Sequence, residues 1–120
     1  MSTIQYYIHF LKNAFNFTGR ASIEQFFSVI VANFAANLFL TVFAFLLRIT
    51  GTNLEFIFKI FQIPLFIFWI YSLIAFLTLC IRRLHDSGKL FIWILVPFLN
   101  IYLLLQKGDE EKNKYGEVPV

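Results

Sequence analysis

The sequence predicts an all-α integral membrane protein with an N-terminal interfacial helix, two spanning helices and a third, short, proline-broken membrane segment. Apolar residues make up 59% of the 120 positions and charged residues only 14%, against about 25% charged residues in soluble domains. Residues 26–47 and 60–81 contain no charge, and each stretch exceeds the roughly 20 residues that an α-helix needs to cross a bilayer. The 17 Phe, 5 Tyr and 2 Trp residues exceed what one small soluble core accommodates, so many of them are expected to face lipid.

Residues 2–16 are predicted to form an amphipathic helix that lies at the membrane surface. Ile4, Ile8, Leu11 and Phe15 share one face at helical spacing. The stretch is too short and too polar to span, because it also carries Lys and His, and an amphipathic helix of this kind is typical of the membrane interface.

Local signals mark where the spanning helices begin and end. Ser22 and Gln25 have the spacing of a capping box just before the first apolar run. Pro64 lies in the first turns of the second run, where a missing N–H costs least. The second helix is expected to continue through the charged residues after position 81 and to stop at Gly88.

The first run carries a polar stripe. Asn33, Asn37 and Thr41 are four residues apart, beside Ala32 and Ala36. Small and hydrogen-bonding residues on one stripe are typical of membrane helices that pack against each other. We therefore expect the two Asn side chains to face protein; a substrate path is the alternative.

The third apolar run, 90–105, is shorter than the first two. At 1.5 Å per residue it falls short of the roughly 30 Å hydrocarbon core, and it holds Pro97 and Asn100 in its middle. It is predicted either to span or to enter the membrane and return as a broken hairpin. The polar tail, 106–120, is predicted to be a solvent-exposed end.

Charge distribution predicts the orientation. Five basic residues flank the two runs on the side of the N-terminus, namely Lys12, Arg20, Arg82, Arg83 and Lys89. Only Arg48 and Lys59 lie on the other side. Basic residues favour the cytoplasm, so the N-terminus is predicted to be cytoplasmic in a multi-pass protein.

The densest charge cluster between the long apolar runs, 81–89, reads Ile-Arg-Arg-Leu-His-Asp-Ser-Gly-Lys. Arg83 and Asp86 are three apart on a helix and are expected to pair. The simplest interpretation is a topological anchor that contacts anionic lipid. The sharper hypothesis is a head-group or anion site in which Asp86 orients His85; its candidate residues are Arg20, Arg82, Arg83, His85 and Asp86.

Other functions lack the residues they need. Cys80 is the single cysteine and no metal-ligand spacing is present, so we expect no metal, no cofactor and no catalytic residue. Neither long run holds the acidic residue that proton-coupled transport needs, although an oligomeric pore or transporter-like protein remains the alternative. The chain has a net charge of +3. Its basic residues flank the apolar runs, which indicates membrane lipids as partners and not nucleic acid.

Three motifs together resemble the domain-of-unknown-function family 805, the YhaH-type small bacterial inner-membrane proteins. They are Phe-Thr-Gly-Arg-Ala-Ser at 17–22, Arg-Arg-Leu-His-Asp-Ser-Gly at 82–88, and Asn-Lys-Tyr-Gly at 113–116 followed by Pro119. The resemblance implies an integral inner-membrane protein of the bacterial cell envelope and supplies no biochemical activity. The predicted function is therefore a non-enzymatic structural or interaction protein, with a homo-oligomer or another membrane protein as further partners.

Overall fold

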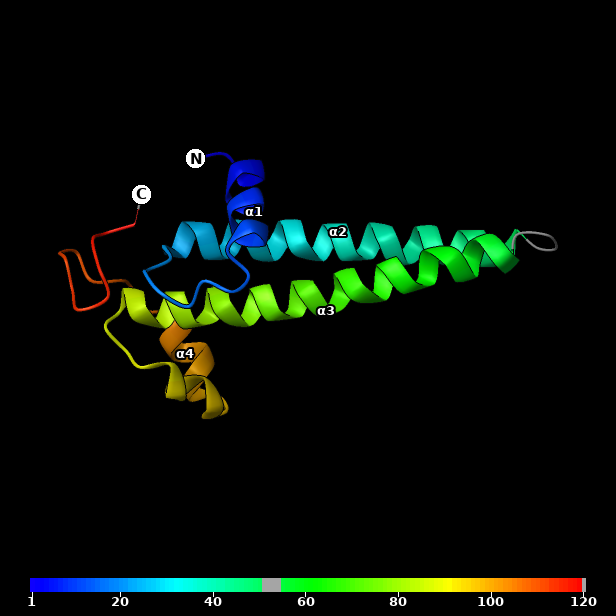
Figure 1. Cartoon of the computed structure of the whole chain (residues 1–120). Helices are drawn as coiled ribbons and strands as arrows, with labels where there is room; N and C mark the ends of the chain where they lie inside the picture. Colours follow the sequence, from blue (N-terminus) through cyan, green and yellow to red (C-terminus); the bar gives the residue numbers. More distant parts are fainter. Residues whose placement is uncertain (51–54, 120) are drawn as a thin grey trace.

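The computed structural model describes residues 1–50 and 55–119, and this part of the chain is helical and contains no strand (Figure 1). The elements are α1 (Thr3–Lys12), α2 (Ile23–Ile49), α3 (Glu55–Asp86), the 3-10 helix η1 (Phe91–Leu95) and α4 (Leu99–Leu105). The long helices α2 and α3 run antiparallel along a molecule of 59 × 31 × 20 Å, and both chain termini lie at the same end (Figure 1).

The two long helices agree with the two predicted spans. Ile23–Ile49 has a mean hydropathy of 2.2, and Lys59–Asp86 a mean hydropathy of 2.3. Both are long and apolar enough to cross a membrane. Each helix extends a few residues beyond its uncharged run, because polar residues at a helix end can still be solvated at the membrane surface.

The predicted capping box forms only in part. The Ser22 hydroxyl accepts a hydrogen bond from the Gln25 backbone N–H at 3.1 Å, which satisfies one free donor at the start of α2. The Gln25 side chain does not return to Ser22; its Nε2 lies 3.2 Å from His9 Nδ1. Gln25 thus links α2 to α1.

Helix α1 crosses the long pair near the start of α2 and buries Tyr6 and Phe10 (Figure 1). It ends at Lys12, earlier than predicted, because the Asn13 side chain donates to the His9 carbonyl at 2.8 Å. Side chains of α3 hold the segment that follows: the Tyr71 hydroxyl donates to the Leu11 carbonyl, and the Thr78 hydroxyl to the Ala14 carbonyl.

The polar stripe of α2 faces α3, as predicted. The Ser72 hydroxyl donates to Asn33 Oδ1 at 2.7 Å, and Asn37 Nδ2 lies 3.4 Å from Ser72 Oγ. Tyr7 of α1 donates to the same Asn33 oxygen at 3.4 Å. Asn33 therefore joins three helices at one point.

The third apolar run is not one continuous helix. It is divided into η1 and α4 by a turn around Pro97 and Phe98. Phe98 has a φ of 66°, a left-handed backbone conformation that residues other than Gly rarely adopt. The predicted break at Pro97 is present, and the choice between a spanning and a re-entrant segment stays a prediction.

Candidate functional site

The charged cluster predicted as a candidate site is buried where the segment before α2, the end of α3 and the tail come together. We call this region the polar junction: residues 19–21, 82–88 and 104–116. Helix α3 continues through the cluster and stops as predicted at Gly88, whose φ is 71°. The Gly88 N–H donates to the His85 carbonyl and the Lys89 N–H to the Leu84 carbonyl, so that the last carbonyls of α3 have partners.

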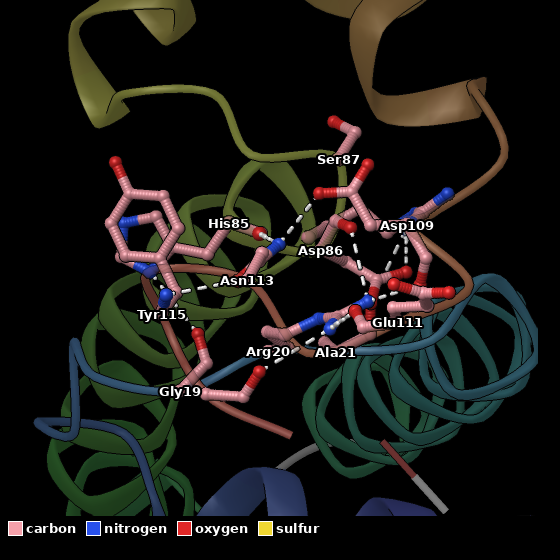
Figure 2. A network of polar contacts seen from close by, with 12 residues as sticks. Gly19, Arg20, Ala21, His85, Asp86, Ser87, Asp109, Glu111, Asn113 and Tyr115 are labelled. Atoms are coloured by element: carbon pink, nitrogen blue, oxygen red, sulfur yellow. Dashed lines mark hydrogen bonds and ion pairs between the residues drawn. The ribbon is translucent and has the colours of Figure 1, made fainter. Parts of the chain in front are cut away.

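Asp86 is held between two buried arginines, Arg20 and Arg83, and Figure 2 shows the first of them beside it. Its Oδ1 accepts from Arg20 Nε at 2.9 Å, and its Oδ2 accepts from Arg83 Nη1 at 2.6 Å. The pairing of Arg83 with Asp86 and the approach of Arg20 are both confirmed. Because each carboxylate oxygen serves a different guanidinium, Asp86 joins the segment before α2 to the end of α3.

The remaining donors of the two arginines bind backbone carbonyls, mostly of the tail. Arg20 Nη1 donates to the Glu111 carbonyl at 2.7 Å, and Arg83 Nε donates to the Leu104 carbonyl at 3.0 Å. Further carbonyl acceptors for these two side chains come from Ala21, Asp86, Gln106, Asp109 and Gly116. The described tail is exposed along much of its length, as predicted, but four of its backbone carbonyls, at residues 106, 109, 111 and 116, bind the two arginines.

His85 is fixed by groups other than Asp86. Its Nδ1 lies 3.1 Å from the Gly19 carbonyl, and its ring stacks on Tyr115 with centroids 3.8 Å apart (Figure 2). Asn113 Nδ2 donates to the His85 carbonyl at 2.9 Å. The prediction that Asp86 orients His85 is wrong, because neighbouring residues on a helix point about 100° apart.

The tail approaches Asp86 so closely that a side chain at position 108 has no room. A Cβ built on Gly108 would lie 1.8 Å from Asp86 Oδ2. The next N–H, of Asp109, donates to the Asp86 carbonyl at 2.7 Å. Gly108 thus permits the tail to pack directly on the ion-paired carboxylate.

Arg82 differs from the other two arginines. Its side chain is buried, with 3% of the residue exposed. Its buried Nε and Nη2 nevertheless have no hydrogen-bond partner in the part of the chain that the structure describes. The pKa of His9 on α1 is lowered by burial and, secondarily, by the positive charge of Arg82. The Nε and Nη2 groups of Arg82 thus lack the tail acceptors that Arg20 and Arg83 have.

The five predicted site residues form three groups. Arg20, Arg83 and Asp86 share one network, His85 belongs to a second group with Tyr115 and Asn113, and Arg82 is separate. The sequence does not predict that the tail carbonyls accept these hydrogen bonds, because every residue type has a backbone carbonyl. It also missed the contacts of Asn113 and Tyr115, although both residues belong to the third motif.

Comparison with known proteins gives a consistent result. The family model described as protein of unknown function DUF805 matches residues 14–117. The chain is 28% identical over 123 residues to the inner membrane protein YhaI of Escherichia coli K12, covering 97% of this chain and 96% of that protein. The protein of the same name in Escherichia coli O157:H7 matches with the same values. No solved structure matches the chain.

Proposed function

Because the chain belongs to the DUF805 family, we propose that it is a bacterial inner-membrane protein that crosses the membrane twice. Two features support this proposal. Its long helices have the length and hydropathy of spans, and the relatives that it resembles over nearly its whole length are inner membrane proteins by name.

We further propose that the N-terminus and the tail both lie in the cytoplasm. The polar junction carries this proposal, because it binds the segment before α2, the end of α3 and the tail to one another, so all three share one side (Figure 1). The basic residues of the tail, Lys107, Lys112 and Lys114, then join those already counted on the N-terminal side. Basic residues next to a span favour the cytoplasmic side.

The two short helical regions are proposed to lie at the cytoplasmic membrane surface. Helix α1 runs across the spans, with Ile4 and Ile8 exposed. At 1.5 Å per residue, α4 is far shorter than the roughly 30 Å hydrocarbon core. The exposed Phe91, Leu95 and Phe98 suit a shallow, broken membrane segment.

We propose a non-enzymatic role in which this surface contacts anionic lipid head groups. Arg20 and Arg83 give their donors to protein acceptors, so they hold the junction together. Lys107, Lys112 and Lys114 in the junction and Lys89 next to it are exposed, and each basic residue near an anionic surface contributes about 1 kcal/mol of attraction.

Cysteine labelling tests the arrangement. In a Cys80→Ser background, single cysteines at Ser2, Ser87 and Val118 are expected to resist an impermeant maleimide in intact spheroplasts and to react after lysis. Thr50→Cys, at the opposite end of α2, is the matched control and should react in intact spheroplasts. Labelling of Ser2→Cys or Val118→Cys before lysis would contradict the shared cytoplasmic side.

An oligomeric pore is the second candidate, for one reason. Asn33, Asn37 and Ser72 line a hollow of about 280 Å³ on the helix pair, and polar groups within a span are typical of ion and solute paths. Reconstituted protein that raises the flux of a small polar solute across liposomes, and loses that flux on Asn37→Leu, would favour this candidate.

A further inference from the structure

Arg82 and Arg83 are neighbours on α3, both are buried, and their surroundings are opposite. Arg83 has a carboxylate and three carbonyls as acceptors. Arg82 has buried Nε and Nη2 groups without an acceptor among the described residues. Buried polar groups are almost always hydrogen-bonded, and a buried charge is normally paired. Arg82 is therefore prepared for an acceptor that the described protein does not supply.

The charge balance indicates the sign of that acceptor. Three arginines are buried at this end, Arg20, Arg82 and Arg83, whereas Asp86 is the buried carboxylate. Asp86 already gives one oxygen to each of the other two arginines. No ion pair to Arg82 occurs within residues 1–50 and 55–119. The missing partner is accordingly an anion.

Arg82 also acts electrostatically on α1. Its positive charge contributes, after the larger effect of burial, to the lowered pKa of His9. Gln25 Nε2 of α2 contacts His9 Nδ1 of α1 at 3.2 Å. The Ala21 N–H donates to the Arg82 carbonyl at 3.0 Å, which fixes the backbone at this position.

We propose that the unpartnered Nε and Nη2 groups of Arg82 form a specific site for the oxyanion of a phosphate group, supplied by an anionic phospholipid. This proposal rests on the proposed membrane function, because the cytoplasmic end of a span is the depth at which head-group phosphates lie. A guanidinium presents two parallel donors that match two phosphate oxygens. The same chemistry would accept free phosphate, which the experiment separates.

The test measures thermal unfolding of the full chain in dodecyl maltoside, with added phosphatidylglycerol, phosphatidylcholine or inorganic phosphate. We expect phosphatidylglycerol to raise the midpoint of the parent protein more than phosphatidylcholine does. Arg82→Met should abolish this difference and raise the midpoint without lipid, since it replaces an unpaired buried charge with an apolar side chain. Arg82→Lys keeps the charge but loses the paired donors, and should weaken phosphatidylglycerol binding about tenfold.

Arg48→Met is the matched control, because Arg48 is an exposed arginine at the far end of α2 and should keep the full lipid response. A lipid difference that survives in Arg82→Met overturns the proposal. An equal response of the parent to inorganic phosphate would assign the site to free phosphate, and no response to either phosphate source overturns it. The experiment is done in detergent, so its result is independent of the labelling that tests membrane orientation.

A second measurement applies if Arg82→Met does not fold. A bound phosphate neutralises Arg82, which should raise the pKa of His9, measured by NMR titration of the imidazole in the parent protein with and without phosphatidylglycerol. An unchanged His9 titration at saturating lipid would exclude a phosphate at Arg82.

Discussion

Leu79, Arg83 and Leu84 are completely buried at the end of α3 that lies in the polar junction, whereas Phe45 and Phe61, toward the other end of the helix pair, are exposed. Within the most hydrophobic 18-residue stretch of each long helix, 6% of the residues in α2 and 28% of those in α3 are buried inside the protein. The two regions are therefore stabilised differently. The polar junction is held by hydrogen bonds and ion pairs within the chain, whereas the remote half of the pair exposes apolar side chains that suit lipid. Asn33, Asn37 and Ser72 form polar contacts between the two long helices nearer the middle of the pair.

The largest effect is expected when the junction loses its only buried carboxylate. Asp86→Asn leaves Arg20 and Arg83 buried without a counter-charge, and breaking a buried ion pair on one side costs about 3–5 kcal/mol. We expect a large fall in the thermal unfolding midpoint in detergent, or no folded protein. Asp109→Asn is the control, because Asp109 is an exposed acid whose side chain accepts from Asn113. An equal loss in both variants would show that Asp86 is not the centre of the junction.

The second prediction concerns the fit of the tail on Asp86. Gly108→Ala places a methyl group against a carboxylate that two arginines hold in position. Overpacking of this kind typically costs about 1–3 kcal/mol. Limited proteolysis should then remove the tail faster than in the parent. Lys107→Ala, at the neighbouring exposed position, should change the cleavage rate little, since exposed ion pairs such as the one with Glu110 contribute about 0–1 kcal/mol.

Local physics accounts for the part of this fold that the sequence could predict. Uncharged runs identify α2 and α3, because crossing a bilayer requires length and hydropathy alone. The Arg83 and Asp86 pair follows from helical spacing. The packing of residues 104–116 on the junction depends on backbone carbonyls from distant positions, such as Glu111 for Arg20. No residue pattern encodes those acceptors, which is why the sequence did not predict that the tail packs on the junction.

The contrast between Arg82 and Arg83 shows the same limit. Helical spacing predicts Asp86 as the partner of Arg83 alone, and both arginines were candidates for one anion site. A helix turns about 100° per residue, and Arg83 reaches the carbonyls of Leu104 and Gln106, whereas the Nε and Nη2 groups of Arg82 have no acceptor among the described residues. Only the tertiary structure reveals that one arginine is structural and the other lacks an acceptor.

The third prediction addresses the membrane half of the comparison. Replacing Asn33 and Asn37 together with Leu removes the contacts with Ser72. Interhelical hydrogen bonds in membrane proteins are worth about 0.6 kcal/mol each, so the unfolding midpoint should fall by less than in Asp86→Asn. Thr41→Val is the control, since its hydroxyl donates to the Asn37 carbonyl of the same helix. A midpoint that is unchanged or raised in the double variant would contradict the packing role of this stripe.

The smallest expected effect is a pH dependence at the edge of the junction, where α1 meets the helix pair. Burial and the charge of Arg82 lower the pKa of His9 below its ordinary value of 6.5. Between the lowered pKa and 6.5, the unfolded chain binds a proton that the folded chain does not, so the contribution to stability is full above 6.5 and declines as the pH falls through that window. Protonation would also remove the acceptor that His9 Nδ1 offers to the Gln25 amide. We expect the unfolding midpoint of the parent to fall between pH 7 and pH 5, and the fall to be smaller in His9→Gln, which stays neutral throughout. Identical slopes in the two proteins would assign the pH dependence to other groups, and would leave the contact between α1 and the helix pair insensitive to the charge on His9.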